Sequence, residues 1–344
     1  MQLCRGTFTP IRIANAAKVD VGKYDETLGL ILLHILHGIY YVFAGAATEV
    51  YHQAHIQVVH FRNQLIKVAL PHAPLMAVNV NKRKLGPVLR VFRYFQGRGL
   101  VILVTGGSRG IGAGISQQLL EAGAQLALHY NSKEAEARAL IKGYEERCAL
   151  FQADLSDSQS TIQLFEQVIA HFGKLDVLVN NAGVAVSSAA DALDAQWIAD
   201  WDFTMDVNLR ATGILCKKAV AHFLTQGGGR IINISSRAAF RGDTADYLAY
   251  AASKGGVVAL TRSIARAYGK QNVKAFNIAP GFVRTDMAQD FMDQYGEAYA
   301  LDDIALNQLT EPKDLAPMVA LLCSGLADHA TGCSIDINAG SYVH

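Results

Sequence analysis

A glycine-rich stretch that begins at Thr105 constrains the fold more than any other feature of the sequence. Residues 105–112 read TGGSRGIG; they follow the apolar run LVILV at 100–104 and precede a helix-like pattern that continues to Leu120. Glycines permit a tight turn and close approach of a ligand to the backbone, and the N-terminus of a helix attracts phosphate groups. A strand, a glycine-rich turn and a helix in this order predict a dinucleotide-binding site.

From residue 99 onward, apolar runs alternate with helical patterns, which is typical of βαβ units and of a parallel sheet with helices on both faces. We expect strands at 100–105, 124–130, 148–153, 175–180, 229–235, 273–278 and 333–337. We expect helices near 110–122, 132–146, 157–172, 194–224, 247–269 and 311–324. The sequence therefore predicts an α/β fold with a doubly wound, seven-stranded parallel sheet that binds ligands at the carboxyl ends of its strands.

Charge separates the chain into two segments of different character. Residues 1–98 contain 12 Lys and Arg against 4 Asp and Glu, whereas residues 99–344 contain 19 against 26. We therefore divide the chain into an N-terminal extension of unknown role and fold, 1–98, and a nucleotide-binding domain, 99–344. A further interpretation is that the extension lies outside the working protein, because the second segment is complete without it.

Two stretches of the extension bear on membrane and nucleic-acid binding. Residues 28–47 contain no Asp, Glu, Lys or Arg, and 20 residues are about the length that crosses a bilayer as a helix. His34, His37 and three glycines weaken that interpretation and favour a buried helix, with membrane contact kept as the alternative. The basic stretch at 82–98 is interpreted as a solvated linker, and we expect no nucleic-acid partner.

Cysteines and histidines indicate the compartment and argue against a metal site. The five cysteines contain no CxxC pair and are odd in number, which favours a reducing compartment, so we expect a cytoplasmic protein. Six of the 11 histidines lie in the extension, where Glu49 is the one carboxylate among them. Metal sites normally show a fuller ligand set, so we expect no metal.

The end of the second predicted strand determines which dinucleotide is favoured. An acidic residue about 20 positions beyond the glycine turn would bond the ribose hydroxyls of NAD. Residues 129–133 instead read HYNSK, and Arg109 lies within the glycine turn. With no carboxylate to repel a 2′-phosphate and a guanidinium to bind it, the sequence favours NADP(H) over NAD(H). The alternative is that Arg109 is a solvated turn residue.

A tyrosine and a lysine carry the predicted chemistry. Tyr250 and Lys254 lie four residues apart in a helix-like segment, so they share one face about one turn apart. A phenol with a pKa near 10 is a poor acid or base at neutral pH, and a nearby ammonium is expected to lower that pKa. Of the 13 tyrosines, Tyr250 alone has a lysine four residues later.

The same motifs, in this order, resemble the short-chain dehydrogenase/reductase family, and most of all its 3-oxoacyl-(acyl-carrier-protein) reductases. The resemblance covers residues 99–344 and implies a Rossmann-type fold. It implies hydride transfer between the nicotinamide of NADP(H) and a carbonyl or secondary alcohol, and assembly as a homotetramer or homodimer. The segment 331–340 is similar to the last strand and tail that pack at subunit interfaces in this family.

The resemblance also assigns residues. Tyr250 would donate or accept the proton, Lys254 would hold the ribose and lower the tyrosine pKa, Ser236 would fix the substrate oxygen, with Ser235 as the alternative, and Asn208 would hold a water. The implied cofactor contacts come from the glycine turn, the ends of the second, third and fourth strands, the tyrosine helix and the turn after the sixth strand. They are Gly106, Ser108, Arg109, Gly110, Ile111, Gly112, Asn131, Ser132, Asp154, Leu155, Asn181, Ala182, Gly183, Tyr250, Lys254, Pro280, Gly281, Val283 and Thr285.

The substrate is left open between several classes. A 3-oxoacyl thioester, as in fatty acid biosynthesis, fits the overall pattern, but residues 225–229 (TQGGG) lack the basic residues that often meet an acidic carrier protein. The 13 residues between Ser236 and Tyr250 are one more than we expect for such reductases. A sugar, steroid or small-alcohol dehydrogenase is the alternative. A non-catalytic, cofactor-binding regulatory protein is a third, which the presence of Tyr250 and Lys254 disfavours.

Overall fold

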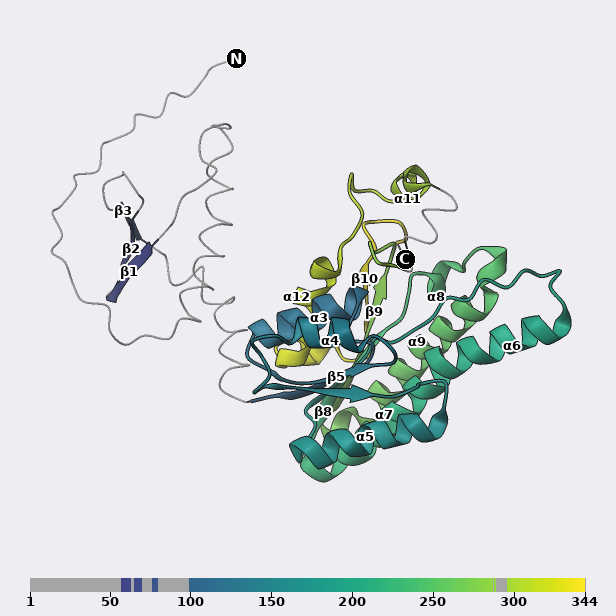
Figure 1. The fold of residues 1–344 in the computed structure, drawn as a ribbon, viewed down its shortest axis with the longest axis horizontal. Coiled ribbons are helices and arrows are strands. Elements are labelled where there is room, and N and C mark those ends of the chain that lie inside the picture. Colours follow the sequence, from purple (N-terminus) through teal and green to yellow (C-terminus); the bar gives the residue numbers. More distant parts are fainter. Residues whose placement is uncertain are drawn as a thin grey trace, which may run out of the picture. The chain divides into compact units, whose positions relative to one another are not determined.

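Seven parallel strands form one sheet in the second of the two compact units into which the chain divides, 1–87 and 88–344 (Figure 1). The computed structural model describes residues 57–62, 65–69, 76–79, 99–286, 288 and 296–343. Within the first unit these include a three-stranded antiparallel sheet with order β1-β2-β3. Its strands are β1 (Gln57–Arg62), β2 (Leu65–Ala69) and β3 (Met76–Asn79).

Two predictions for the extension lie outside the described residues: the apolar stretch at 28–47 and the basic stretch at 82–98. No helix within the described part of the chain has the length and apolar character needed to cross a membrane. The small antiparallel sheet at 57–79 was not predicted from the sequence.

The large sheet has the order β10-β9-β8-β7-β4-β5-β6, which confirms the predicted doubly wound fold. Most residues of its strands are apolar and buried, because helices cover both faces of the sheet. The winding reverses between β4 and β7, whose carboxyl ends therefore border a crevice. The strands are β4 (Val101–Val104), β5 (Gln125–Tyr130), β6 (Cys148–Gln152), β7 (Val177–Asn180), β8 (Gly229–Ile234), β9 (Val273–Pro280) and β10 (Ser334–Ile337).

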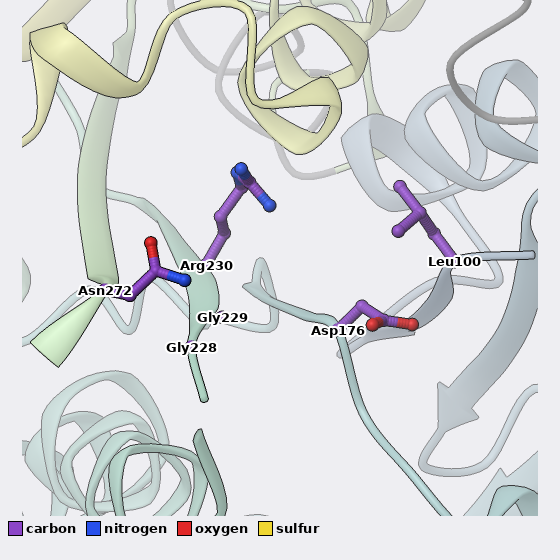
Figure 2. A pocket seen from close by; sticks show the side chains of 6 residues that line it. All are labelled: Leu100, Asp176, Gly228, Gly229, Arg230 and Asn272. Atoms are coloured by element: carbon purple, nitrogen blue, oxygen red, sulfur yellow. The ribbon is translucent and has the colours of Figure 1, made fainter. Parts of the chain in front are cut away.

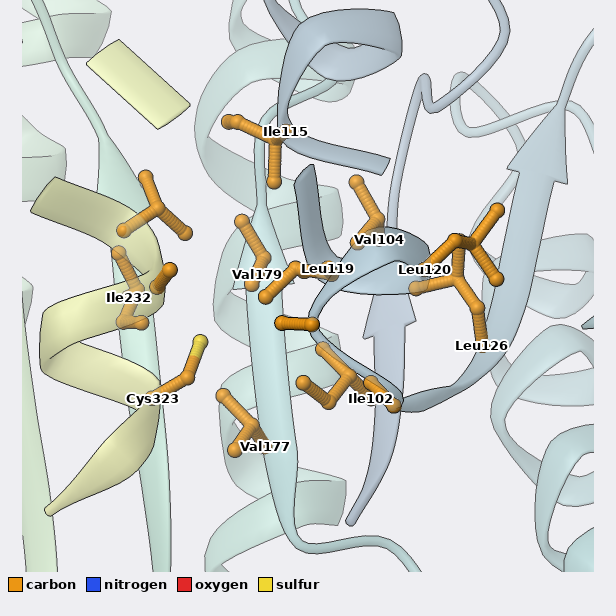
Figure 3. Packing of buried hydrophobic residues seen from close by; sticks show 14 of the residues in the cluster. Ile102, Val104, Ile115, Leu119, Leu120, Leu126, Val177, Val179, Ile232 and Cys323 are labelled. Atoms are coloured by element: carbon orange, nitrogen blue, oxygen red, sulfur yellow. The ribbon is translucent and has the colours of Figure 1, made fainter. Parts of the chain in front are cut away.

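Helices pack on the sheet in two layers. One core, part of which Figure 3 shows, joins Ile115 and Leu119 of α3 and Val319 of α12 to one face of the sheet. The other core contains Phe165 of α5 and Leu215 of α7. The helices are α3 (Gly110–Glu121), α4 (Glu134–Leu140), α5 (Ser158–Phe172), α6 (Asp194–Met205), α7 (Ala211–Gln226), α8 (Ala238–Arg241), α9 (Leu248–Tyr268), α11 (Glu297–Asp302) and α12 (Pro312–Ser324).

The helix predicted at 194–224 is interrupted. A π-helical turn, Asp206–Arg210, separates α6 from α7 and contains the buried Asn208. Such a turn inserts one residue without breaking the helical pattern of apolar residues, so periodicity does not detect it. The helix predicted at 132–146 is also shorter than expected, because α4 ends at Leu140 and Gly143 adopts a φ of 86°.

Candidate functional site

The carboxyl ends of β4, β7 and β8 and the first turns of α3 and α9 surround the candidate site. The glycine turn follows β4, and Ser236 follows β8. The NNAG segment, residues 180–183, begins at the last residue of β7. Tyr250 and Lys254 lie in α9, and Asn208 lies in the π-helical turn. Five chain segments that are distant in sequence therefore meet at one edge of the sheet.

Glycine is required in the turn for two different reasons. Gly106 has a φ of 61°, and a Cβ on it would lie 3.0 Å from the Cα of Ala182. Gly112 lies in the first turn of α3, where the backbone packs against the glycine turn. A Cβ there would lie 2.0 Å from the Gly106 carbonyl oxygen. The side chain of Arg109, which precedes α3, donates to Asp286 at 3.1 Å instead of capping the first turn. The backbone N–H groups at this helix start fit an anionic group such as a pyrophosphate.

The NNAG segment is hydrogen-bonded to the glycine turn. Asn181 Nδ2 donates to the carbonyl oxygens of Thr105 and Gly106 at 2.9 and 3.1 Å. In return, Thr105 Oγ1 accepts from the backbone N–H groups of Asn181 and Ala182, both at 3.0 Å. These bonds hold the ends of β4 and β7 together, so the two predicted cofactor-binding segments form one surface.

The residues predicted to bind the adenosine half lie at the ends of β5 and β6. Asn131 and Ser132 are exposed, and Asn131 accepts from Gln152 Nε2 through its backbone oxygen at 3.1 Å. Asp154 is held by a turn in which its carboxylate accepts from Ser156, while Leu155 is buried. The structure therefore leaves the side chains of Asn131 and Ser132 accessible beside the glycine turn.

The predicted residues after β9 lie across from the same turn. Gly281 packs so closely on the chain that a Cβ would lie 2.8 Å from the Cα of Asn338. Val283 forms an isolated bridge with Thr310, and Thr285 Cγ2 would lie 3.1 Å from a Cβ on Gly110. Thr285 therefore abuts the start of α3, which places the segment after Pro280 at the cofactor crevice.

Tyr250, Ser236 and Lys254 lie together. The Tyr250 hydroxyl is hydrogen-bonded to Ser236. The buried Lys254 ammonium donates to the Ile234 carbonyl oxygen at 3.1 Å and lies 5.7 Å from the centre of the Tyr250 ring. A Cβ on Gly183 would lie 3.1 Å from Lys254 Nζ, so that glycine gives the lysine its room. Ser235, the alternative serine, instead donates to the Ile278 carbonyl oxygen.

Both polar atoms of the Asn208 side chain are hydrogen-bonded within the protein. Its Oδ1 accepts from the Val184 N–H, and its Nδ2 donates to the Val184 carbonyl oxygen, both at 2.8 Å. Nδ2 also donates to Ser253 Oγ at 3.0 Å, and Ser253 Oγ donates to the Tyr250 carbonyl oxygen at 2.7 Å. This chain of bonds links the NNAG segment to the turn of α9 that carries Tyr250.

The pKa of Tyr250 is raised, whereas the sequence led us to expect that a nearby ammonium lowers it. Burial lowers the pKa of Lys254 to about 8. Burial raises the pKa of Tyr250 above its ordinary value; the hydrogen bond with Ser236 and the charge of Arg237 act in the opposite direction, and Asp243 adds to the rise. The expected lowering by Lys254 is not found, because its ammonium is directed to the Ile234 carbonyl oxygen and desolvation of the phenolate dominates.

Three residues of the site were not predicted. His129 of β5 bonds the glycine turn through its ring, with Nδ1 accepting from the Gly106 N–H at 3.0 Å. Ser253 joins Asn208 to α9, as described above. Arg237, directly after Ser236, is buried, pairs with Asp303 at 2.6 Å and lies over the Phe282 ring. Each acts on a residue remote in sequence, so no local motif marks it.

A hollow lies at the opposite edge of the sheet from the candidate site, at the amino ends of the strands (Figure 2). Its charged groups already have protein partners: Asp176 accepts from the Val101 N–H at 2.8 Å, and Arg230 makes two bonds to Asp328 at 2.9 and 2.8 Å. Among the described residues, no cluster of His, Cys, Asp or Glu is arranged to hold a metal ion. The chemistry-bearing side chains therefore gather at the carboxyl edge.

Known proteins are similar to this chain in sequence and in fold. The family model described as enoyl-(acyl carrier protein) reductase matches residues 106–342. The 3-oxoacyl-(acyl-carrier-protein) reductase FabG of Staphylococcus aureus is 34% identical over 244 residues, which are 70% of this chain and 97% of that protein. This chain is a short-chain dehydrogenase/reductase. As a member of that family, it is an oxidoreductase of the class that interconverts alcohols and carbonyl compounds.

Other short-chain dehydrogenases/reductases are nearly as similar, and one of them is named for a different substrate. The 3beta-hydroxysteroid dehydrogenase 1 of Eggerthella lenta is 33% identical over 248 residues, which are 71% of this chain and 94% of that protein. The solved structure of a short chain dehydrogenase from Burkholderia cenocepacia in complex with NADP is 32% identical, with a TM-score of 0.66, covering 72% of this chain and 99% of that one. The family and a nicotinamide cofactor are therefore supported, whereas identity alone does not select a substrate.

Proposed function

We propose that this protein is an NADP(H)-dependent oxidoreductase that transfers hydride between nicotinamide and a carbonyl or secondary alcohol. The observation that carries the proposal is the position of the Tyr250 hydroxyl. It bonds Ser236 and shares a helix face with the buried Lys254, next to a glycine turn that fits a pyrophosphate. A non-catalytic, cofactor-binding protein would use the lysine for the ribose, but it would have no use for a tyrosine hydroxyl held beside Ser236.

In the proposed reduction, Tyr250 and Ser236 act on the same substrate oxygen. Bound NADPH supplies the hydride that adds to the carbonyl carbon. Ser236 donates a hydrogen bond that fixes the oxygen, and Tyr250 transfers its hydroxyl proton to that oxygen as the carbonyl becomes an alcohol. In the reverse direction, the Tyr250 oxygen takes the alcohol proton.

Lys254 and Asn208 support the proton transfer. The Lys254 ammonium would hold the ribose hydroxyls. The hydrogen bond with Ser236 and the charge of Arg237 favour the tyrosinate that remains after the proton has left. Asn208 is proposed to hold a water for the proton relay through Lys254. Its side chain is occupied by Val184 and Ser253, so its own orientation is fixed before any ligand enters.

The preference for NADP(H) rests on Arg109 and on the end of β5. The Arg109 guanidinium lies at the helix start, and the exposed segment that contains Asn131 and Ser132 presents no carboxylate to a 2′-phosphate. Solved relatives in complex with NADP or NADPH agree with this proposal. The remaining cofactor contacts are proposed from the glycine turn, Asp154, the NNAG segment and the turn after Pro280.

A 3-oxoacyl thioester is the first substrate class that we propose to test, because relatives named for that activity are 31–34% identical to this chain. The loop 225–229 has no basic residue for a carrier protein, so the thioester of coenzyme A is the better probe. A steroid, sugar or small alcohol is the alternative, and the steroid dehydrogenase relative favours the first of these.

Assembly and location are also proposals. Strand β10 lies at an edge of the sheet, where a second copy could pack, so we propose a homodimer or homotetramer. Cys148, Cys216, Cys323 and Cys333 are free thiols, which favours a reducing compartment, and we propose the cytoplasm. Light scattering of the purified protein tests the assembly.

A screen for NADPH oxidation tests the function. Acetoacetyl-CoA, a ketosteroid, a keto sugar and a small ketone are each added to the full chain with NADPH, and absorbance of the reduced cofactor is followed. Turnover of at least one carbonyl compound, lost in Tyr250→Phe, is expected. If NADPH binds but the wild type and Tyr250→Phe oxidise it equally slowly with every class, the catalytic proposal is contradicted and the regulatory alternative gains support.

A further inference from the structure

His129 connects the two sides of the cofactor crevice through both nitrogens of its ring. It lies in β5 and is buried in the sheet interior, with an exposed fraction of 2%. Nδ1 accepts from the Gly106 N–H at 3.0 Å, and Nε2 lies 3.1 Å from the Ala153 carbonyl oxygen. The His129 backbone oxygen also accepts from the Gly107 N–H at 2.8 Å. Two consecutive N–H groups of the glycine turn therefore donate hydrogen bonds to the same residue.

The two partners determine the protonation of the ring. A backbone carbonyl only accepts, so Nε2 must carry the hydrogen, and a backbone N–H only donates, so Nδ1 must be bare. The ring is thus neutral with a fixed tautomer. Burial lowers the pKa of His129 to about 4, against the opposing effects of the Ala153 bond and of Asp154. The imidazole consequently keeps both bonds throughout the neutral range.

The two bonded segments would contact different parts of the proposed nucleotide. Gly106 belongs to the turn that would meet the pyrophosphate, and Ala153 directly precedes Asp154 and Leu155, which would border the adenine. The spacing between the two segments is therefore set by one rigid ring. An aliphatic residue would fill the same space in β5 but would leave the Gly106 N–H without its acceptor, at a cost to the turn.

We propose that His129 is a positioning residue for the dinucleotide, which holds the glycine turn in register with the adenine side of the crevice. The inference rests on the proposed NADP(H) function, because it concerns the affinity for that cofactor. It assigns to His129 a role beyond core packing. Loss of its two hydrogen bonds should lower the affinity for the cofactor by more than the loss of folding stability alone explains.

Binding of NADPH to the full-length protein, followed by cofactor fluorescence, tests the proposal without any substrate. His129→Ala removes both ring bonds, and His129→Phe fills the volume without them, which keeps a folded variant available if alanine unfolds the sheet. His129→Gln retains one donor and one acceptor. His222→Ala is the matched control, because His222 Nε2 also accepts a backbone N–H, that of Leu175 at 3.2 Å, but at the amino end of β7.

We expect the dissociation constant of NADPH to rise about tenfold or more in His129→Ala or His129→Phe, which is the effect of losing about one buried hydrogen bond of the cradle. His129→Gln should recover most of the affinity, and His222→Ala should bind as the wild type does at a matched temperature below each melting point. Equal affinity of folded His129→Phe and wild type would overturn the inference, as would an equal loss in His222→Ala. Failure of the wild type to bind NADPH or NADH would instead overturn the proposed function.

Discussion

Arg109 donates a hydrogen bond to the carboxylate of Asp286, with Nη1 and Oδ2 3.1 Å apart. The guanidinium that we assign to a 2′-phosphate thus has a carboxylate partner of its own, 177 positions later in the chain. Both side chains are at least half exposed, and exposed ion pairs contribute only about 0–1 kcal/mol. A phosphate can therefore replace Asp286 at little cost, yet Asp286 competes with it.

Asp286→Asn should tighten NADPH binding and leave NADH binding unchanged. The variant removes the charge that competes for Arg109, and a gain of about two- to fivefold corresponds to a weak surface pair. Titration of both cofactors at low and moderate salt measures the effect. Glu121→Gln, which removes an exposed carboxylate from the other end of α3, is the control for net charge. An equal gain for NADH would contradict the competition.

Arg109→Ala combined with Ser132→Asp should reverse the cofactor preference. The first change removes the guanidinium from the 2′-phosphate, and the second adds a carboxylate at the end of β5, where it can bond ribose hydroxyls and repel the phosphate. The ratio of the NADPH and NADH dissociation constants should shift toward NADH by about tenfold or more. An unchanged ratio would remove the basis for assigning the phosphate to this position.

Lys254→Met should abolish turnover but stabilise the fold at neutral pH. The pKa of Lys254 falls from 10.5 to about 8, so burying the charged form costs about 3 kcal/mol at pH 7, of which the bond to Ile234 returns about 1. We expect a net gain of about 2 kcal/mol in the free energy of unfolding.

The pH dependence of that gain provides the check. Between pH 8 and 10.5 the unfolded chain binds a proton that the folded protein does not, so wild-type stability gains relative to the variant as the pH rises. The advantage of Lys254→Met should shrink by about 2 kcal/mol from pH 7 to pH 9.5. Denaturant melts at both values measure it, with the exposed Lys217→Met as the control. A variant less stable than wild type at pH 7 would contradict the account.

His129 should make the protein sensitive to acid. The pKa of His129 falls from 6.5 to about 4 on folding, so the unfolded chain binds the extra proton between these values and stability decreases as the pH falls through this window. Protonation of this ring in the unfolded chain should lower the free energy of unfolding by about 3 kcal/mol between pH 7 and pH 4. The difference between wild type and His129→Gln in urea melts at pH 7 and pH 4.5 isolates it. A constant difference would show that the ring is not neutral in the folded protein.

Much of the second unit follows from local pattern. All seven strands lie where apolar runs predicted them, because strands covered on both faces must be apolar throughout, and the motifs follow strands whose carboxyl ends share one edge. The π-helical turn at Asn208 escaped prediction, since one inserted residue leaves the helical pattern of apolar positions nearly unchanged.

The direction of side chains could not be predicted in the same way. The spacing of Tyr250 and Lys254 places them on one helix face, but the ammonium is directed to the Ile234 carbonyl oxygen on β8. The pairing of Arg109 with Asp286 and the two bonds of His129 likewise depend on segments that the sheet brings together. Long-range contacts of single polar atoms leave no periodic signal in a single sequence.

Turnover of Tyr250→Phe, measured with NADPH and a carbonyl compound reduced by the wild type, tests the central claim most directly. Tyr247→Phe, three residues earlier, is the matched control. Removing a general acid should lower kcat by about 10²- to 10⁴-fold. NADPH affinity should stay within about twofold, since the cradle is intact, and Tyr247→Phe should keep most of its rate. A Tyr250→Phe variant that binds NADPH and turns over at a rate close to that of the wild type would contradict the assignment of proton transfer to Tyr250.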